Sequence, residues 1–74
     1  MILITSEVCA PCKMVKMKID ELKLHNRVKI LSTSSDRGRA IVMQYGIRSV
    51  PTLITKDENL LVGGPAIIKY LSEV

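Results

Sequence analysis

Two cysteines, Cys9 and Cys12, are separated by two residues where a short apolar run gives way to a segment of helix-forming residues. The apolar run, residues 2–5, is typical of a strand. Pro11 occupies a position that the first turn of a helix tolerates, since an N–H there would have no partner inside the helix. The sequence therefore predicts two thiols at the mouth of a helix that directly follows a strand.

This placement has three consequences for the thiols. The amides of the opening helical turn and the helix dipole favour an anion, which lowers the pKa of the Cys9 thiol and raises its thiolate fraction. A spacing of one helical turn brings the two sulfurs within bonding reach. Cys12 lies on the core-facing side of the helix and is expected to be the more shielded thiol. We therefore expect Cys9 to attack a substrate disulfide and Cys12 to resolve the mixed disulfide.

Such a cysteine pair can also be half of a metal site. His25 is the only histidine and there is no second cysteine pair, so one chain cannot supply four Cys or His ligands. A metal or iron–sulfur carrier that dimerises through Cys9 and Cys12 stays open as an alternative. A purely structural disulfide is less favoured, because closing so short a loop removes little entropy from the unfolded chain. We expect no metal and no cofactor beyond a redox-active Cys9–Cys12 disulfide.

The rest of the chain alternates between strand and helix patterns, separated by glycine, proline and short polar runs. The expected strands cover residues 2–5, 28–31, 52–55 and 60–62, and the expected helices cover residues 10–24, 36–45 and 66–73. The last two strands are expected to pair as a hairpin. This order, β-α-β-α-β-β-α, predicts a single α/β domain over residues 1–74.

The first helix has two apolar faces when its residues are spaced by about 100°. The face expected to pack in the core consists of Cys12, Val15, Ile19 and Leu22. The other face consists of Met14, Met17 and Leu24, and it either packs against neighbouring elements or stays partly open. An open methionine face would suit a docking surface, because methionine adapts to varied partners. His25 is expected to contact the last carbonyls of this helix.

The second helix follows a polar run that offers several N-cap oxygens. Its apolar contacts are expected from Ala40, Ile41, Val42 and Tyr45. Gly38 is expected to weaken the helix by up to ~1 kcal/mol relative to alanine. Gly46 fits the position just after the helix, where a left-handed conformation ends it.

Charge and composition narrow the classes of partner. The formal net charge of +4 can favour nucleic acid, an anionic membrane or acidic proteins. The basic residues are scattered and no aromatic residue lies among them to stack on bases, so we do not expect nucleic-acid binding. No segment reaches the ~20 apolar residues needed to cross a bilayer, and the first apolar run is too short for a signal peptide. We therefore expect a cytoplasmic monomer that binds no membrane.

Pro51 stands directly before the apolar run of residues 52–55. On its own, this proline would only mark the entry to a strand. Together with the cysteine pair after the first strand, it indicates a cis Val50–Pro51 bond that turns the backbone sharply beside the sulfurs. The exposed main-chain groups of Val50 could then pair with an extended substrate segment, as in strand addition.

Two segments carry a resemblance to a known family. Residues 9–15, Cys-Ala-Pro-Cys-Lys-Met-Val, resemble the active-site segment of thioredoxins, and residues 45–53 resemble their cis-proline segment. The short length and the pair Gly63 and Gly64 before the last helix resemble glutaredoxins instead. The resemblance covers essentially the whole chain. It implies the thioredoxin fold, in which three helices flank a four-stranded mixed sheet.

The resemblance also implies dithiol–disulfide exchange. It assigns Cys9 as the nucleophile, Cys12 as the resolving thiol and Pro51 as the cis-proline beside them. The other candidates for substrate binding are Pro11, Val50, Gly63 and Gly64. The implied partners are protein disulfides and, as electron donor, either a thioredoxin-reductase-type enzyme or glutathione.

Departures from the two family patterns bear on the choice of donor. Glutaredoxins usually carry Lys or Arg a few residues before the first cysteine to bind a glutathione carboxylate, which Glu7 here would repel. They also tend to follow the glycine pair with a polar or acidic pair, whereas Pro65 and Ala66 follow here. Thioredoxins usually carry Trp where this chain has Val8. We expect a protein-disulfide reductase of glutaredoxin size with thioredoxin-like activity, and a glutathione-dependent glutaredoxin is the alternative.

Overall fold

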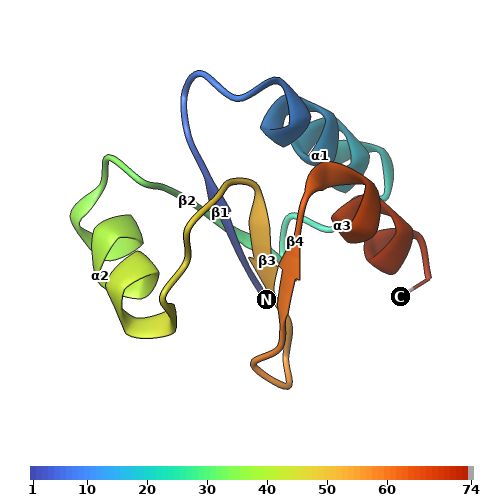
Figure 1. The fold of residues 1–74 in the computed structure, drawn as a ribbon. Helices are drawn as coiled ribbons and strands as arrows, with labels where there is room; N and C mark the ends of the chain where they lie inside the picture. Colours follow the sequence, from blue (N-terminus) through green and yellow to red (C-terminus); the bar gives the residue numbers. More distant parts are fainter. Residues whose placement is uncertain (74) are drawn as a thin grey trace.

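Strands and helices follow one another in the predicted order, and the computed structural model describes residues 1–73. The strands are β1 (Ile2–Thr5), β2 (Lys29–Ser32), β3 (Thr52–Ile54) and β4 (Leu60–Val62), and the helices are α1 (Ala10–Glu21), α2 (Asp36–Tyr45) and α3 (Gly64–Ser72). In Figure 1 the sheet forms a middle layer, with α1 and α3 together on one side and α2 on the other. This four-stranded mixed sheet with three flanking helices confirms the predicted fold class.

The sheet brings two functionally important segments to one edge. Its strand order is β2-β1-β3-β4; β1 is parallel to β2 and antiparallel to β3, and β3 and β4 form the predicted hairpin. Ile4 near the end of β1 lies opposite Thr52 at the start of β3. The loop from β1 to the cysteines and the turn that carries Pro51 therefore leave the sheet at the same edge (Figure 1).

The core consists of aliphatic side chains from β1, β3, α1 and α3, in a chain that has no phenylalanine or tryptophan. Its most deeply buried members are Leu3, Val15, Ile19, Leu53, Ile67 and Leu71. Burying one such side chain contributes about 1.5–3 kcal/mol. The core face of α1 is the predicted one, since Cys12, Val15 and Ile19 are the buried residues of that helix. Leu22 packs half-buried against the same cluster.

The second apolar face of α1 divides between core and solvent. The helix ends at Glu21 rather than at residue 24, because the chain turns at Lys23, where φ is +55°. The turn directs Leu24 into the core, where it is buried. Met14 and Met17 stay exposed.

The remaining boundaries differ from the prediction by one or two residues. β2 covers residues 29–32 rather than 28–31, and β3 ends at Ile54. The last helix covers residues 64–72 rather than 66–73, because the glycine before Pro65 already belongs to its first turn. His25 contacts the side chain of Asp20 rather than the last carbonyls of α1.

Gly38 is the buried residue of α2, which corrects the predicted contacts of that helix. The residues expected to pack are only half-buried at Ile41, Val42 and Tyr45 and exposed at Ala40. The reason is a close approach of α2 to the end of β2. A methyl group added at Gly38 would overlap the carbonyl oxygen of Ser32. Glycine at this position therefore allows α2 to pack closely against the end of β2, although its helix propensity is low.

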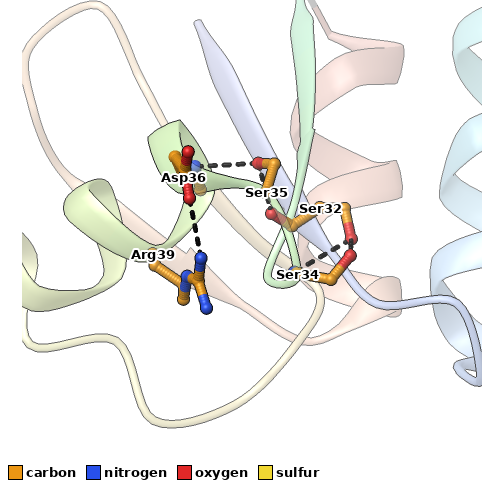
Figure 2. Close-up of polar contacts among 6 residues, drawn as sticks. Ser32, Ser34, Ser35, Asp36 and Arg39 are labelled. Atoms are coloured by element: carbon orange, nitrogen blue, oxygen red, sulfur yellow. Dashed lines mark hydrogen bonds and ion pairs between the residues drawn. The ribbon is translucent and has the colours of Figure 1, made fainter.

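Ser35 links α2 to the end of β2 at this point. Its hydroxyl accepts a hydrogen bond from the Gly38 amide at 3.0 Å and donates one to the Ser32 carbonyl at 2.8 Å (Figure 2). Ser35 is thereby the N-cap of α2. An ion pair between Asp36 and Arg39, 2.7 Å long, closes the exposed side of the first turn (Figure 2).

The C-terminal end of α2 is held by two interactions. Gly46 adopts the predicted left-handed conformation, with φ +65°, and the amide of Ile47 bonds to the carbonyl of Val42 at 3.0 Å. The Tyr45 hydroxyl donates a hydrogen bond to Glu58 in the turn between β3 and β4 at 2.9 Å. This bond to the Glu58 carboxylate raises the pKa of Tyr45 above its ordinary value. Tyr45 therefore joins α2 to the hairpin.

The Gly38→Ala variant separates helix propensity from packing. Propensity alone predicts a gain in stability of up to ~1 kcal/mol. The overlap with Ser32 predicts instead a loss of about 1–3 kcal/mol. Urea unfolding followed by circular dichroism measures the difference. Gln44→Ala, at an exposed position of the same helix, is the control and is expected to change the free energy of unfolding by less than ~0.5 kcal/mol. A Gly38→Ala protein at least as stable as wild type would contradict this packing.

Candidate functional site

Cys9 and Cys12 lie at the N-terminus of α1 and are joined as a disulfide, with 5.2 Å between their Cα atoms. Cys9 is the N-cap residue and has an extended backbone, with φ −135° and ψ 103°. Its sulfur accepts a hydrogen bond from the Cys12 amide at 3.2 Å, and its carbonyl accepts one from the Lys13 amide at 3.3 Å. The first cysteine thus takes the capping role that a serine or aspartate oxygen has in other helices.

The two cysteine residues differ slightly in their access to solvent. Cys9 is 8% exposed and Cys12 is 1% exposed. Cys12 is more shielded because it belongs to the same buried face of α1 as Val15 and Ile19. The order of exposure is the one expected from the sequence. A reaction partner would therefore meet Cys9 first.

The electrostatic surroundings of Cys9 favour an anion. The Cys12 amide points at the Cys9 sulfur at the N-terminal end of α1, where the helix dipole is positive, and the first turn contains no acidic residue. Lys13 is exposed directly after the cysteine pair. The nearest acidic residue in sequence is Glu7, whose side chain is exposed in the loop that leads from β1.

Pro51 follows a cis peptide bond from Val50, as the sequence predicts, and it is buried. The Thr52 hydroxyl donates a hydrogen bond to the Ser49 carbonyl at 2.7 Å, which holds the turn on one side. On the other side the Pro51 carbonyl accepts a hydrogen bond from the Gly63 amide at 3.0 Å. The turn is therefore held by the first residue of β3 and by the residue that follows β4, at the open end of the β3–β4 hairpin.

The glycine pair joins this turn to the cysteine segment. Gly63 has φ +96°, a conformation that other residues rarely adopt, and it bonds to Pro51. Gly64 is buried, and a methyl group added there would lie 3.4 Å from the Cβ atom of Pro11. The structure therefore brings together Pro11, Pro51, Gly63 and Gly64, which come from three separate parts of the sequence.

Val50, the remaining predicted residue, borders a hollow of about 270 Å³. The hollow is also lined by Ser6 from the cysteine loop, by Thr33 after β2 and by Arg48 before the turn. Thr33 did not emerge from the sequence analysis. Thr33 directly follows β2, which runs parallel to β1. Because the ends of parallel strands meet at one edge of a sheet, this position could have predicted that Thr33 lies near the loop after β1.

Within residues 1–73, no three His, Cys, Asp or Glu side chains lie together in a way that could hold a metal ion. None of the helices in that range has the length and apolar character needed to cross a membrane.

Several known proteins with similar sequences are thioredoxins. The family model described as "Thioredoxin" matches residues 1–66. Thioredoxin 1 of Synechococcus elongatus is 42% identical over 52 residues, which cover 66% of this chain and 49% of the relative. The thioredoxin of Rickettsia felis is 43% identical over 51 residues, with the same two coverages. The chain spans about half the length of the curated relatives it matches.

A solved structure extends the similarity to nearly the whole chain. This structure, described as "Structure of a malarial protein", covers 97% of this chain, which in turn covers 91% of it, with a TM-score of 0.58. At 20% sequence identity it supports the fold alone. The family model covers most of the chain and the sequence relatives agree with it, so this chain belongs to the thioredoxin family.

Proposed function

We propose that this protein is a dithiol–disulfide oxidoreductase that reduces disulfide bonds of other proteins through Cys9 and Cys12. The observation that carries the proposal is the Cys9–Cys12 disulfide at the N-terminus of α1, with Cys9 as the more exposed residue of the pair. Family membership supports it, since the sequence relatives are thioredoxins. The reaction needs no cofactor, because the two sulfurs carry the electrons.

The proposed reaction begins with both cysteines reduced. The Cys9 thiolate attacks one sulfur of a substrate disulfide and forms a mixed disulfide, and the other substrate sulfur leaves as a thiolate that takes up a proton. Cys12 then gives up its proton and attacks the Cys9 sulfur. The Cys9–Cys12 disulfide forms, and the second substrate sulfur leaves and is protonated. Two electrons pass from the protein to the substrate.

The first step depends on the anion-stabilising end of α1. In the oxidised form the Cys9 sulfur accepts a hydrogen bond from the Cys12 amide. When Cys9 is a thiolate, its sulfur can accept the same bond, and its negative charge can interact with the helix dipole. The second step depends on the short distance between the cysteines, which lie 5.2 Å apart at their Cα atoms. Cys12 can therefore reach the Cys9 sulfur without a large backbone movement.

Val50 supplies the proposed binding edge for the substrate. Within residues 1–73, the amide and carbonyl of Val50 make no hydrogen bond. Pro51 follows it directly at the sheet edge that also carries the cysteine loop. An extended substrate segment could pair with these main-chain groups, as in strand addition. The cis-proline turn and the glycine pair would border that segment.

We propose a thioredoxin-reductase-type enzyme as the electron donor rather than glutathione. Glu7 is exposed in the loop before Cys9, where its charge would repel a glutathione carboxylate. Pro65 and Ala66 follow the glycine pair and offer no acidic or polar side chain to the other end of glutathione. We further propose that the protein acts as a monomer in a reducing compartment such as the cytoplasm, where a dithiol is kept reduced.

Two serine variants test the assignment of roles. Cys9→Ser is expected to reduce insulin disulfides no faster than dithiothreitol does alone, because it lacks the attacking sulfur. Cys12→Ser is expected to accumulate mixed disulfides on Cys9, detectable by mass spectrometry, because nothing resolves them. Circular dichroism confirms that both variants are folded. A Cys9→Ser variant with full activity would exclude the mechanism.

The choice of donor is tested by coupling the same insulin assay to two regeneration systems. We expect insulin to be reduced when NADPH and a thioredoxin reductase regenerate the protein. With glutathione, NADPH and glutathione reductase instead, we expect the turnover rate to be lower. Glu7→Lys removes the proposed repulsion and is expected to raise turnover with glutathione, while Glu7→Gln, which only removes charge, should have a smaller effect. If the wild-type protein turned over only in the glutathione system and not with thioredoxin reductase, the proposal would be contradicted.

A further inference from the structure

An apolar groove lies between α1 and α3, next to the cysteine segment. It consists of two hollows of about 340 and 230 Å³, which share Met14 and Ile68 and so form one continuous surface. Met17, Lys18 and Glu21 line the first hollow. Pro11, Gly64 and Pro65 line the second. We call this surface the α1–α3 groove.

The methionines of the groove point away from the core of the protein. Met14 is 62% exposed and Met17 is 69% exposed, whereas Val15 and Ile19 on the opposite face of α1 are fully buried. Their spacing of three residues places the two methionines next to each other on the helix surface. Ile68 adds an aliphatic side chain from α3. Met14, Met17 and Ile68 thus form one apolar surface that is at least partly open to solvent.

Positive charge flanks the groove on both helices. Lys13 precedes Met17 by one helical turn, and Lys69 follows Ile68 on α3; both are exposed. The ion pairs within residues 1–73 join Lys18 to Glu21, His25 to Asp20 and Arg39 to Asp36, so they neutralise neither Lys13 nor Lys69. Two copies of the chain packed through this face would bring the same lysines together. The charge therefore favours an acidic partner over self-association.

The shape of the groove favours a helix as its occupant. A helix presents apolar side chains three and four residues apart, which can seat between two packed helices. Methionine side chains adapt to such a surface, since they are unbranched and flexible. The groove also extends to Pro11 and Gly64 beside the cysteines. A partner bound there would be held close to Cys9.

We propose that the α1–α3 groove binds an acidic amphipathic helix of a partner protein. The apolar side chains of that helix contact Met14, Met17 and Ile68, and its carboxylates face Lys13 and Lys69. Binding involves no disulfide chemistry. It therefore stands or falls separately from the proposed reductase function.

A synthetic peptide provides the probe. It has 18 residues, with leucine at helical spacing, glutamate elsewhere and fluorescein at its N-terminus; its fluorescence anisotropy is measured against the oxidised protein. We expect saturable binding that weakens with added salt. Met17→Glu is expected to weaken binding by about tenfold, because it puts a charge in the apolar lining of the groove. Met43→Glu is the matched control, since Met43 is also exposed, on α2, and is expected to bind like wild type.

Further variants and peptides sharpen the test. Lys69→Glu is expected to weaken binding by reversing charge at the edge of the groove. A peptide with lysine in place of glutamate, and one with the leucines scrambled, should bind much more weakly than the acidic helix. Met17→Glu and Met43→Glu should both reduce insulin disulfides with dithiothreitol at the wild-type rate. If the wild-type protein bound the peptide but did not reduce insulin disulfides, the result would contradict the proposed reductase function and leave the groove proposal standing.

Three results would overturn the groove proposal. The first is no saturable binding of the acidic peptide to wild type. The second is equal binding by Met17→Glu, or by the lysine peptide. The third is a wild-type dimer in analytical ultracentrifugation that Met17→Glu dissociates, which would show that a second copy of the chain covers the groove.

Discussion

The backbone amide of Cys12, directed at the sulfur of Cys9, is the interaction on which the chemistry of this protein depends. It exists because β1 ends in a loop that places Cys9 at the N-cap of α1, where opening-turn amides have no partners within the helix. The same geometry buries Cys12 behind it. β1 occupies a central position in the sheet and α1 packs on α3, so this junction is held by the best-buried part of the molecule. Pro51 and the glycine pair are joined to it by main-chain hydrogen bonding and close packing.

Much of this could be predicted from sequence, because the signals are local. The order of elements follows from apolar runs separated by glycine, proline and polar turns, and the N-terminal position of Cys9 follows from Pro11 in the first helical turn. The buried face of α1 follows from helical periodicity. The proximity of Pro51 to the glycine pair is not local and was not predicted from the sequence. The hydrogen bond from Gly63 to the Pro51 carbonyl now gives it a physical basis.

The features that could not be predicted arise from tertiary contacts. From the sequence, Gly38 is only a residue of low helix propensity. The structure places it so close to the Ser32 carbonyl that a side chain would not fit there. Leu24 and Met17 belong to one apolar face by periodicity, yet the turn at Lys23 buries the first and leaves the second in solvent. Whether an apolar face is covered depends on which element packs over it. Helical periodicity predicts which residues share an apolar face, but it does not predict which other element packs against that face.

The pKa of the Cys9 thiol tests the central claim most directly. In the reduced Cys12→Ser protein, Cys9 is the only thiol, and the rate of its alkylation by iodoacetamide as a function of pH gives its pKa. The amides of the α1 N-terminus predict a midpoint below that of an unperturbed cysteine, about 8.5. A midpoint at or above this value, in a folded protein, would contradict the account.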